Sequence, residues 1–480
     1  MSLSRSLFVF SAAAIVATAP AYASHPNDFA NVLPPLMQAR DTVPAEKMFL
    51  KDANSSGRNQ LLYLYEMASL YRMAGNTEKS IELFKAADAV AHDYEGKAVV
   101  SAGASMGQVG ATLTNDSLLT WEGAVYDKVM SRTLNAMNFL AKQDLESAQV
   151  EVKKAEEYQS QERDRIQKAV AKGEQKDQKA AETAPAALGS NYNEMYSFAR
   201  NVRNSYENAF TYYLSSQIYS AQGHADDAFI DIARAYELAP QVPAIQTAYL
   251  DMAARAKRET EVAEMKARLG VAPEFQFPDR SRTGTVVVLF EAGFVPPMSE
   301  VSINLPVSGQ LFTMAFPIYN NFKFAAPALL VQTPGGAQTT TKVVDMRQLA
   351  VKSLQERMPS ILTRSTLGAV AKIQAQKEVK KQFGFFGGLA ASIASKLVTV
   401  ADLRSWLSLP AEMQSAQFAL QPGPTELTLT AYDWTEKVAM DVAPGSYTFV
   451  MVKAVPGFKA IRTVSLAPPQ APVAVAQAGS

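Results

Sequence analysis

Cysteine is absent from this chain of 480 residues, and histidine is scarce, with only His25, His92 and His224. The lack of cysteine excludes disulfides, thiolate metal sites and cysteine nucleophiles. The histidines do not fall at i, i+4 or in any other local ligand pattern, so nothing in the sequence indicates a zinc site. We therefore predict that the protein uses no metal and no other cofactor.

The chain also lacks an excess of charge of either sign, because 46 lysines and arginines balance 46 aspartates and glutamates. No general electrostatic attraction to nucleic acid or to acidic lipid follows from such a balance. Apolar residues, by contrast, are plentiful. They make up 48% of the chain, which is enough for about two or three domains with cores of their own.

The N-terminus has the features of a secretory signal peptide. Arg5 supplies a positive charge, residues 7–19 form a short apolar run, and the Ala-Tyr-Ala of residues 21–23 is a small-x-small cleavage site. The run is shorter than the roughly 20 residues that a membrane-spanning helix needs, and no later segment reaches that length. We predict a signal peptide over residues 1–23 and a periplasmic protein, not lipidated, that can associate with the outer membrane peripherally.

Helical periodicity with small residues at a recurring spacing indicates tetratricopeptide-like repeats, each of which is two antiparallel helices in about 34 residues. One unit begins at Ala209 and has its turn at Gly223. Another begins at Leu61 with a turn at Gly75, and a third begins at Val129. Because such hairpins bury their apolar faces by stacking, we predict an N-terminal α-solenoid.

The pattern changes after residue 270, where prolines mark a linker. The run TVVVLFEAGFV then predicts a buried strand, and alternation returns in SAQFALQ, TELTLTAYDW, EKVAMDV and SYTFVMVKAV. The predicted fold class is therefore α+β. Its parts are a tetratricopeptide-like helical domain (24–270), a linker (271–283), a β-sandwich-like domain (284–465) with a helical insertion (345–399), and a disordered tail (466–480).

Few residues suit catalysis. No Gly-x-Ser-x-Gly elbow is present, and the glycine-rich stretch around Gly107 is not followed by the Gly-Lys-Ser/Thr of a phosphate loop. Carboxylates such as Glu291 and Asp345 are available, but nothing in the sequence singles them out. We predict that the protein is not an enzyme, with a hydrolase that uses a carboxylate site as an alternative.

Stacked hairpins form a concave groove from the first helix of each unit, and aromatic residues with a few polar groups suit an extended peptide or a partner helix. We predict a scaffold or adaptor that binds an envelope protein or peptide there. Two alternatives are that the chain's own β-rich domain or glycine-rich loop fills the groove, and that Tyr432 and Trp434 bind cell-wall glycan. The predicted groove residues are Leu62, Tyr65, Ser69, Arg72, Thr133, Met137, Phe210, Tyr213 and Gln217.

Several segments in a fixed order resemble an uncharacterised bacterial envelope family that joins tetratricopeptide-like helices to a β-rich region. They are TLTNDSLLTWEGAVYDKVMSRTLNAMNFLAKQDLESAQVEVKKA, GTVVVLFEAGFVPP, LAVKSLQERMPSILTRSTLGAVAK and ADLRSWLSLPAEMQ. Genes of that family often lie beside lipoproteins resembling a curli-secretion pore and an activator of penicillin-binding proteins. The resemblance implies an outer-membrane or cell-wall context and lends no catalytic residue. The residues that match its recurrent motifs are Asn115, Asp116, Glu122, Tyr126, Arg404 and Trp406.

Overall fold

The computed structural model describes most of the chain. The described residues are 25–102, 119–171, 190–272, 278–279, 281–307, 310–320, 322–324, 326–366, 370 and 400–468. The predicted signal peptide, the motif residues Asn115 and Asp116, nearly all of the predicted insertion beyond residue 366, and most of the predicted tail lie outside them. No helix within the described ranges is long and apolar enough to cross a membrane.

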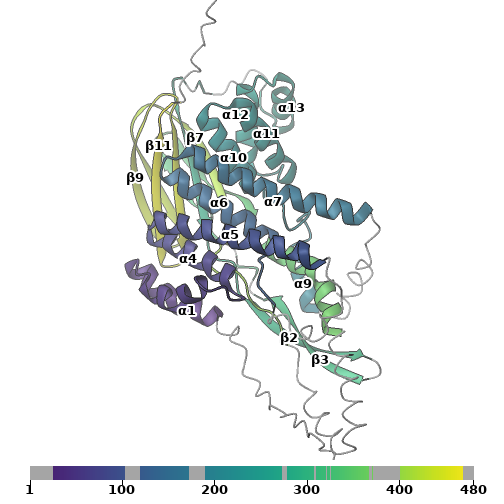
Figure 1. Ribbon diagram of the computed structural model, residues 1–480. Coiled ribbons are helices and arrows are strands. Elements are labelled where there is room, and N and C mark those ends of the chain that lie inside the picture. The colour runs from purple at the N-terminus through teal and green to yellow at the C-terminus, as the bar shows by residue number, and fades with distance from the viewer. Residues whose placement is uncertain are drawn as a thin grey trace, which may run out of the picture.

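Helices fill the N-terminal half, and each of the longer ones packs against the next along the chain, as Figure 1 shows. The short elements between α1 and α4 form a compact connection. The helices are α1 (His25–Ala39), α2 (Val43–Ala45), the π-helix η1 (Glu46–Leu50), α3 (Lys51–Ala53), α4 (Gln60–Ala74), α5 (Thr77–Ala102), α6 (Val125–Ala141), α7 (Leu145–Ala171), α9 (Ser190–Phe198), α10 (Ala209–Gln222), α11 (Ala225–Leu238), α12 (Pro243–Arg255) and α13 (Glu259–Leu269).

The predicted hairpins are present because their turns have suitable chemistry. Gly75 and Gly223 end α4 and α10 with φ angles of 88° and 83°, which glycine adopts without steric cost. The turn between α6 and α7 instead uses Gln143 at a φ of 60°. At the other end of α10, Asn208 accepts hydrogen bonds from the backbone N–H groups of Phe210 and Thr211.

Strands follow in the C-terminal region, where they form three sheets. The sheet orders are β11-β10-β1-β7-β6, β2-β3 and β5-β4-β8-β9. The central strands β1 and β10 run parallel to each other. The strands are β1 (Gly284–Ala292), β2 (Met298–Val307), β3 (Gln310–Tyr319), β4 (Leu330–Thr333), β5 (Gly336–Thr339), β6 (Thr341–Asp345), β7 (Glu412–Leu420), β8 (Gly423–Ala431), β9 (Trp434–Val442), β10 (Tyr447–Val455) and β11 (Phe458–Leu466).

Strand β1 is buried on both faces, as its unbroken apolar run predicts. Val286, Val288 and Phe290 belong to a core shared with β8 and β9 of the four-stranded sheet. Val287 and Leu289 face the opposite way and belong to the core that contains the helices. The five-stranded sheet is thus a middle layer, with helices against one face and the four-stranded sheet against the other.

The two-stranded sheet extends away from these layers (Figure 1). Residues 346–366 form a helix, which is the described part of the predicted insertion. Asp345, the last residue of β6, precedes this helix and accepts a hydrogen bond from the N–H of Arg347 at 3.1 Å. The fold is therefore mixed α+β, with helices in the N-terminal half and sheets after them.

Candidate functional site

The helical face predicted to receive a partner lies against the chain's own five-stranded sheet. The predicted groove side chains come from α4, α6 and α10. Those that are buried are Leu62, Tyr65, Ser69, Thr133, Met137, Phe210, Tyr213 and Gln217. Arg72 retains 15% side-chain exposure. The structure thus places the predicted groove residues together, as the surface on which the β-rich region packs.

Polar contacts join α10 to this sheet. Tyr213 Oη lies 2.9 Å from Ser415 Oγ on β7. Gln217 donates to the side-chain oxygen of Gln417 at 3.1 Å, and the hydroxyls of Ser220 and Tyr447 are 2.6 Å apart. These pairs satisfy polar groups that burial would otherwise leave without partners, which makes the contact specific as well as apolar.

A second set of contacts joins α4 to the C-terminal region. Arg72 forms an ion pair with Glu291 of β1 at 2.5 Å. The buried carboxylate of Glu66 accepts the backbone N–H groups of Leu407 and Ser408 at 2.7 and 3.1 Å. Such charge-assisted bonds are about twice as strong as neutral ones. The α4 helix is therefore held to two separate segments of the β-rich region.

The remaining predicted groove residues connect neighbouring hairpins. The hydroxyls of Thr133 on α6 and Thr211 on α10 lie 2.8 Å apart in the core. Ser69 is buried on α4, and Met137 of α6 lines a cavity at the edge of the sheet. None of these four side chains is more than 5% exposed. They hold the helices in register and do not form an open surface.

The described family-motif residues close the junction between the two halves. Trp406 stacks on Tyr65 with ring centroids 4.7 Å apart. Arg404 binds Asp402 through two nitrogens, at 2.8 and 2.6 Å, and donates to the carbonyl of Leu119 at 3.0 Å. Tyr126 is buried on α6. These contacts give Tyr126, Arg404 and Trp406 a structural role at the junction.

Glu122 and Arg404 also line a cavity of about 610 Å³ between the 119–123 loop, β2, β3 and the 346–366 helix. Arg357 and Arg364 of that helix face the same space. The guanidinium of Arg404 is already bound to Asp402, so its charge is neutralised there. We assign this cavity no ligand.

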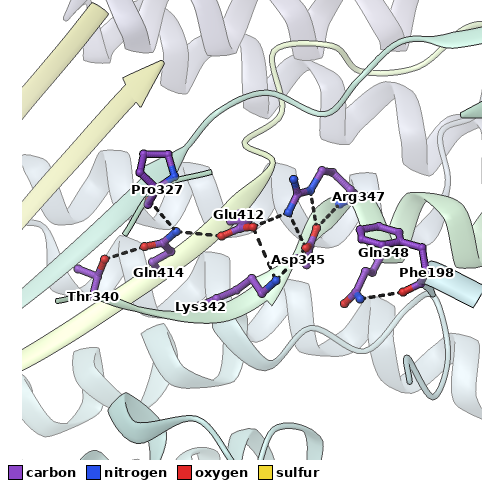
Figure 2. Close-up of polar contacts among 9 residues, drawn as sticks. All are labelled: Phe198, Pro327, Thr340, Lys342, Asp345, Arg347, Gln348, Glu412 and Gln414. Atoms are coloured by element: carbon purple, nitrogen blue, oxygen red, sulfur yellow. Dashed lines mark hydrogen bonds and ion pairs between the residues drawn. The ribbon is translucent and has the colours of Figure 1, made fainter. Parts of the chain in front are cut away.

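Two carboxylates do come together, as the hydrolase alternative requires. Figure 2 shows Asp345 and Glu412 both joined to Arg347 by dashed lines, with Lys342 beside them. Arg347 donates to both oxygens of Asp345, at 2.9 and 2.7 Å, and also binds Glu412. Burial lowers the pKa of Arg347, but the hydrogen bonds and charges of Asp345 and Glu412 raise it by more.

Both carboxylates of this cluster are paired with cations. Lys342 Nζ lies 3.1 Å from Asp345 and 3.7 Å from Glu412. Gln414 donates to Glu412 at 2.9 Å and accepts from Thr340 at 2.6 Å (Figure 2). Because each carboxylate is bound by cations, neither is arranged as a general acid or a nucleophile. The other available carboxylate, Glu291, is paired with Arg72.

Acidic side chains elsewhere have altered proton affinity. Burial raises the pKa of Asp127 to about 7, although its bond to the N–H of Ala124 opposes this. Burial, followed by the charge of Asp231, raises the pKa of Glu156 to about 7. Within the described part of the chain, no group of three His, Asp or Glu side chains is placed to hold a metal ion.

The aromatics considered for glycan binding are half-buried on the four-stranded sheet. Lys459 lies over the ring of Trp434, with Nζ 5.3 Å from the ring centroid. Burial raises the pKa of Tyr432, whose φ angle is 51°. The two rings therefore do not present a flat exposed platform for a sugar.

The sequence predicts the helical residues of the helix–sheet contact but not which strand residues they meet. Ser415, Gln417 and Tyr447 lie in segments predicted to be strands, but their helical partners are 202, 200 and 227 residues away in sequence. Several polar residues within β7, among them Ser415 and Gln417, are unusual in a largely buried strand and are the available signal. No family model matches the chain, and no curated protein matches it either.

Proposed function

We propose that the protein is an exported periplasmic scaffold that binds an envelope protein with its outer surface while its own sheet occupies the groove. We interpret the stacked hairpins as a tetratricopeptide-like solenoid and the two larger sheets as a sandwich. The observation that supports the closed groove is the set of bonds from Arg72, Tyr213 and Gln217 to the sheet.

A partner that entered the groove would have to displace these bonds. Each buried polar group left without a partner costs about 1–3 kcal/mol, and charged groups such as Glu291 cost more. Burying the same apolar faces again would offset this only if the partner were as large as the sheet. Recognition on the outer surface avoids that cost, so we favour it.

The pairing of the three candidate carboxylates with cations supports a binding role over a hydrolase. Asp345 and Glu412 share Arg347, and Glu291 is bound by Arg72. A catalytic acid needs an altered proton affinity and access to a substrate. Each of these three carboxylates is bound by a cation and is at most 4% exposed.

The experiment uses the natural lack of cysteine to lock the groove. The N–H of Ala244 on α12 lies 3.3 Å from Thr341 Oγ1 on β6, so these two positions are chosen for an Ala244→Cys/Thr341→Cys variant. Mass spectrometry of the unreduced protein first checks that the disulfide has formed. The oxidised and reduced forms of this variant, each bearing an affinity tag, are incubated with envelope extract. Partners are identified by mass spectrometry and compared with those of the wild type.

We expect both forms to recover the same partner. Loss of that partner in the oxidised form alone would mean that the groove opens, and would refute recognition by the outer surface. If the oxidised variant, the reduced variant and the wild type all fail to retain a specific partner after crosslinking in cells, the proposed scaffold function is refuted.

A further inference from the structure

A small cavity lies where the α4–α5 turn, α6, β10 and β11 meet. Its volume is about 210 Å³, below the roughly 300 Å³ at which pockets for drug-sized ligands begin. Arg40 is exposed at its mouth, Arg462 is partly exposed, and Lys453 is buried at its floor. The cavity therefore runs from the surface to the middle sheet.

Positive charge predominates in this cavity. Four cationic side chains line it (Arg40, Arg72, Lys453 and Arg462), against the single carboxylate of Glu291. Arg72 uses that carboxylate in its ion pair. Among the described residues, Arg40, Lys453 and Arg462 form no ion pair. Three cations thus share a partly dehydrated space without a carboxylate of their own.

Neutral acceptors hold these cations in place. Arg40 donates to the carbonyls of Met73 and Lys459 at 2.7 and 2.5 Å. Arg462 donates to Thr77 Oγ1 at 2.5 Å and more weakly to the carbonyl of Gly75 at 3.4 Å. Each guanidinium has five N–H donors, so these bonds fix its orientation and leave donors for a ligand.

The floor is constrained in the same way. Lys453 Nζ donates to the carbonyl of Gly293 at 3.2 Å and lies 4.6 Å from the centroid of the Phe294 ring. An ammonium has three donors, so this one bond does not satisfy it. The charged side chains are therefore oriented before any ligand arrives, which lowers the entropy that binding must overcome.

The positive charges that line this cavity are also destabilised by burial and by one another. Burial lowers the pKa of Lys453 to about 8, with Glu291 opposing this and Arg72 adding to it. Burial and the charge of Arg72 lower the pKa of Arg462, and burial lowers that of Arg40. A negative charge placed among them would relieve this repulsion and bind more strongly than in water, because the surroundings are less polar.

The rest of the lining is apolar. Met73, Met137, Met451 and Ile461 border the cavity. Methionine is unbranched and adapts its shape to what it contacts. A bare inorganic anion would leave these side chains unused, whereas a carboxylate attached to an aliphatic group would use both parts of the cavity.

From this geometry we propose that the cavity binds the carboxylate of an acylated apolar amino acid, as found at the free C-terminus of a peptide. The guanidinium groups of Arg40 and Arg462 contact the carboxylate at the mouth. The aliphatic side chain packs on the methionines. This inference rests on the cavity alone and does not require the scaffold function.

The test uses N-acetyl-leucine and N-acetyl-leucinamide as probes, which differ only in the carboxylate. Binding to the full chain is measured by isothermal titration calorimetry or ligand-observed NMR. We expect the amide to bind at least about tenfold more weakly, since it lacks the negative charge that strengthens hydrogen bonds from the two guanidinium groups. A tetrapeptide ending in leucine, as acid and as amide, tests whether a chain end fits as well as a free acylated amino acid.

The variants are Arg40→Gln and Arg462→Gln, each expected to weaken N-acetyl-leucine binding about tenfold. The control is Lys437→Gln, which removes an exposed cation paired with Glu426 on the four-stranded sheet. Because Arg40 is exposed, its variant keeps the test valid if Arg462→Gln fails to fold.

Three results would overturn the proposal. They are equal binding of acid and amide, unchanged affinity in Arg40→Gln, and no saturable binding up to about 10 mM, at which even a complex with a millimolar Kd would be largely formed. Tighter binding of inorganic phosphate than of N-acetyl-leucine would also contradict it, because the apolar lining would then have no role.

Discussion

Replacement of Arg347 by methionine tests whether the carboxylate cluster is structural. Asp345 and Glu412 are each 4% exposed, and Arg347 is the buried cation between them. Removing one partner of a buried ion pair typically costs about 3–5 kcal/mol, because the charges that remain are neither solvated nor neutralised. Lys342, which is 46% exposed at its side chain, offsets a part of that cost. We therefore expect Arg347→Met to lower the free energy of unfolding by about 3 kcal/mol.

Urea unfolding followed by tryptophan fluorescence measures this change, since Trp406 is buried between the two halves of the chain. The matched control is Lys342→Met. It removes the other cation from the same carboxylates, and we expect a loss below about 1 kcal/mol because that side chain is largely solvated. Adding Glu412→Gln to Arg347→Met should recover stability, since only one buried charge then remains. If Arg347→Met costs no more than Lys342→Met, the cluster does not hold the strands and helix together as we argue.

Three further substitutions test separate parts of the structure. The pKa of Asp127 is raised to about 7, against roughly 3.9 in an unfolded chain. The folded state therefore binds more protons between these values, and the free energy of unfolding should fall as pH rises from about 4 to 7. Asp127→Asn should flatten that slope in urea titrations at several pH values, and an unchanged slope would exclude Asp127 as its source. Glu66→Gln presents an amide donor to the N–H of Leu407 or Ser408. It should lower the free energy of unfolding by about 2–3 kcal/mol, also measured by urea unfolding. A loss under about 0.5 kcal/mol would contradict the link between α4 and this loop. Gly270 has a φ of 66° with open space around it, so Gly270→Ala should lower the thermal midpoint through about 1 kcal/mol of backbone strain. The control Gly96→Ala, at an exposed position within α5, should raise the midpoint. A stabilising Gly270→Ala would refute the strain argument.

Local chemistry is what the sequence predicts best here. Gly75 and Gly223 indicate the hairpin turns because glycine adopts a positive φ without steric cost. The run from Thr285 predicts a strand buried on both faces, and β1 is one. Strand β11 was not among the predicted strands, because Phe458–Leu466 mixes apolar and charged residues without clear alternation.

The occupant of the groove depends on pairing between distant segments, which periodicity does not encode. The sequence left a partner and the chain's own β-rich domain as alternatives for the surface around Tyr213. The bond between Tyr213 and Ser415 spans 202 residues, and nothing local to either residue indicates the other. The same holds for Arg347 and Glu412, whose side chains meet through β6 and β7 pairing.

The parallel pairing of β1 with β10 has a consequence for how the chain acquires its structure. Synthesis begins at the N-terminus, so the helices and β1 emerge well before the strand that completes the centre of the sheet. Until then the helical surface and one edge of β1 stay uncovered, and both can associate with other chains. A chain cut short before Tyr447 should therefore aggregate, and a helper protein that shields newly made chains should act before that residue appears.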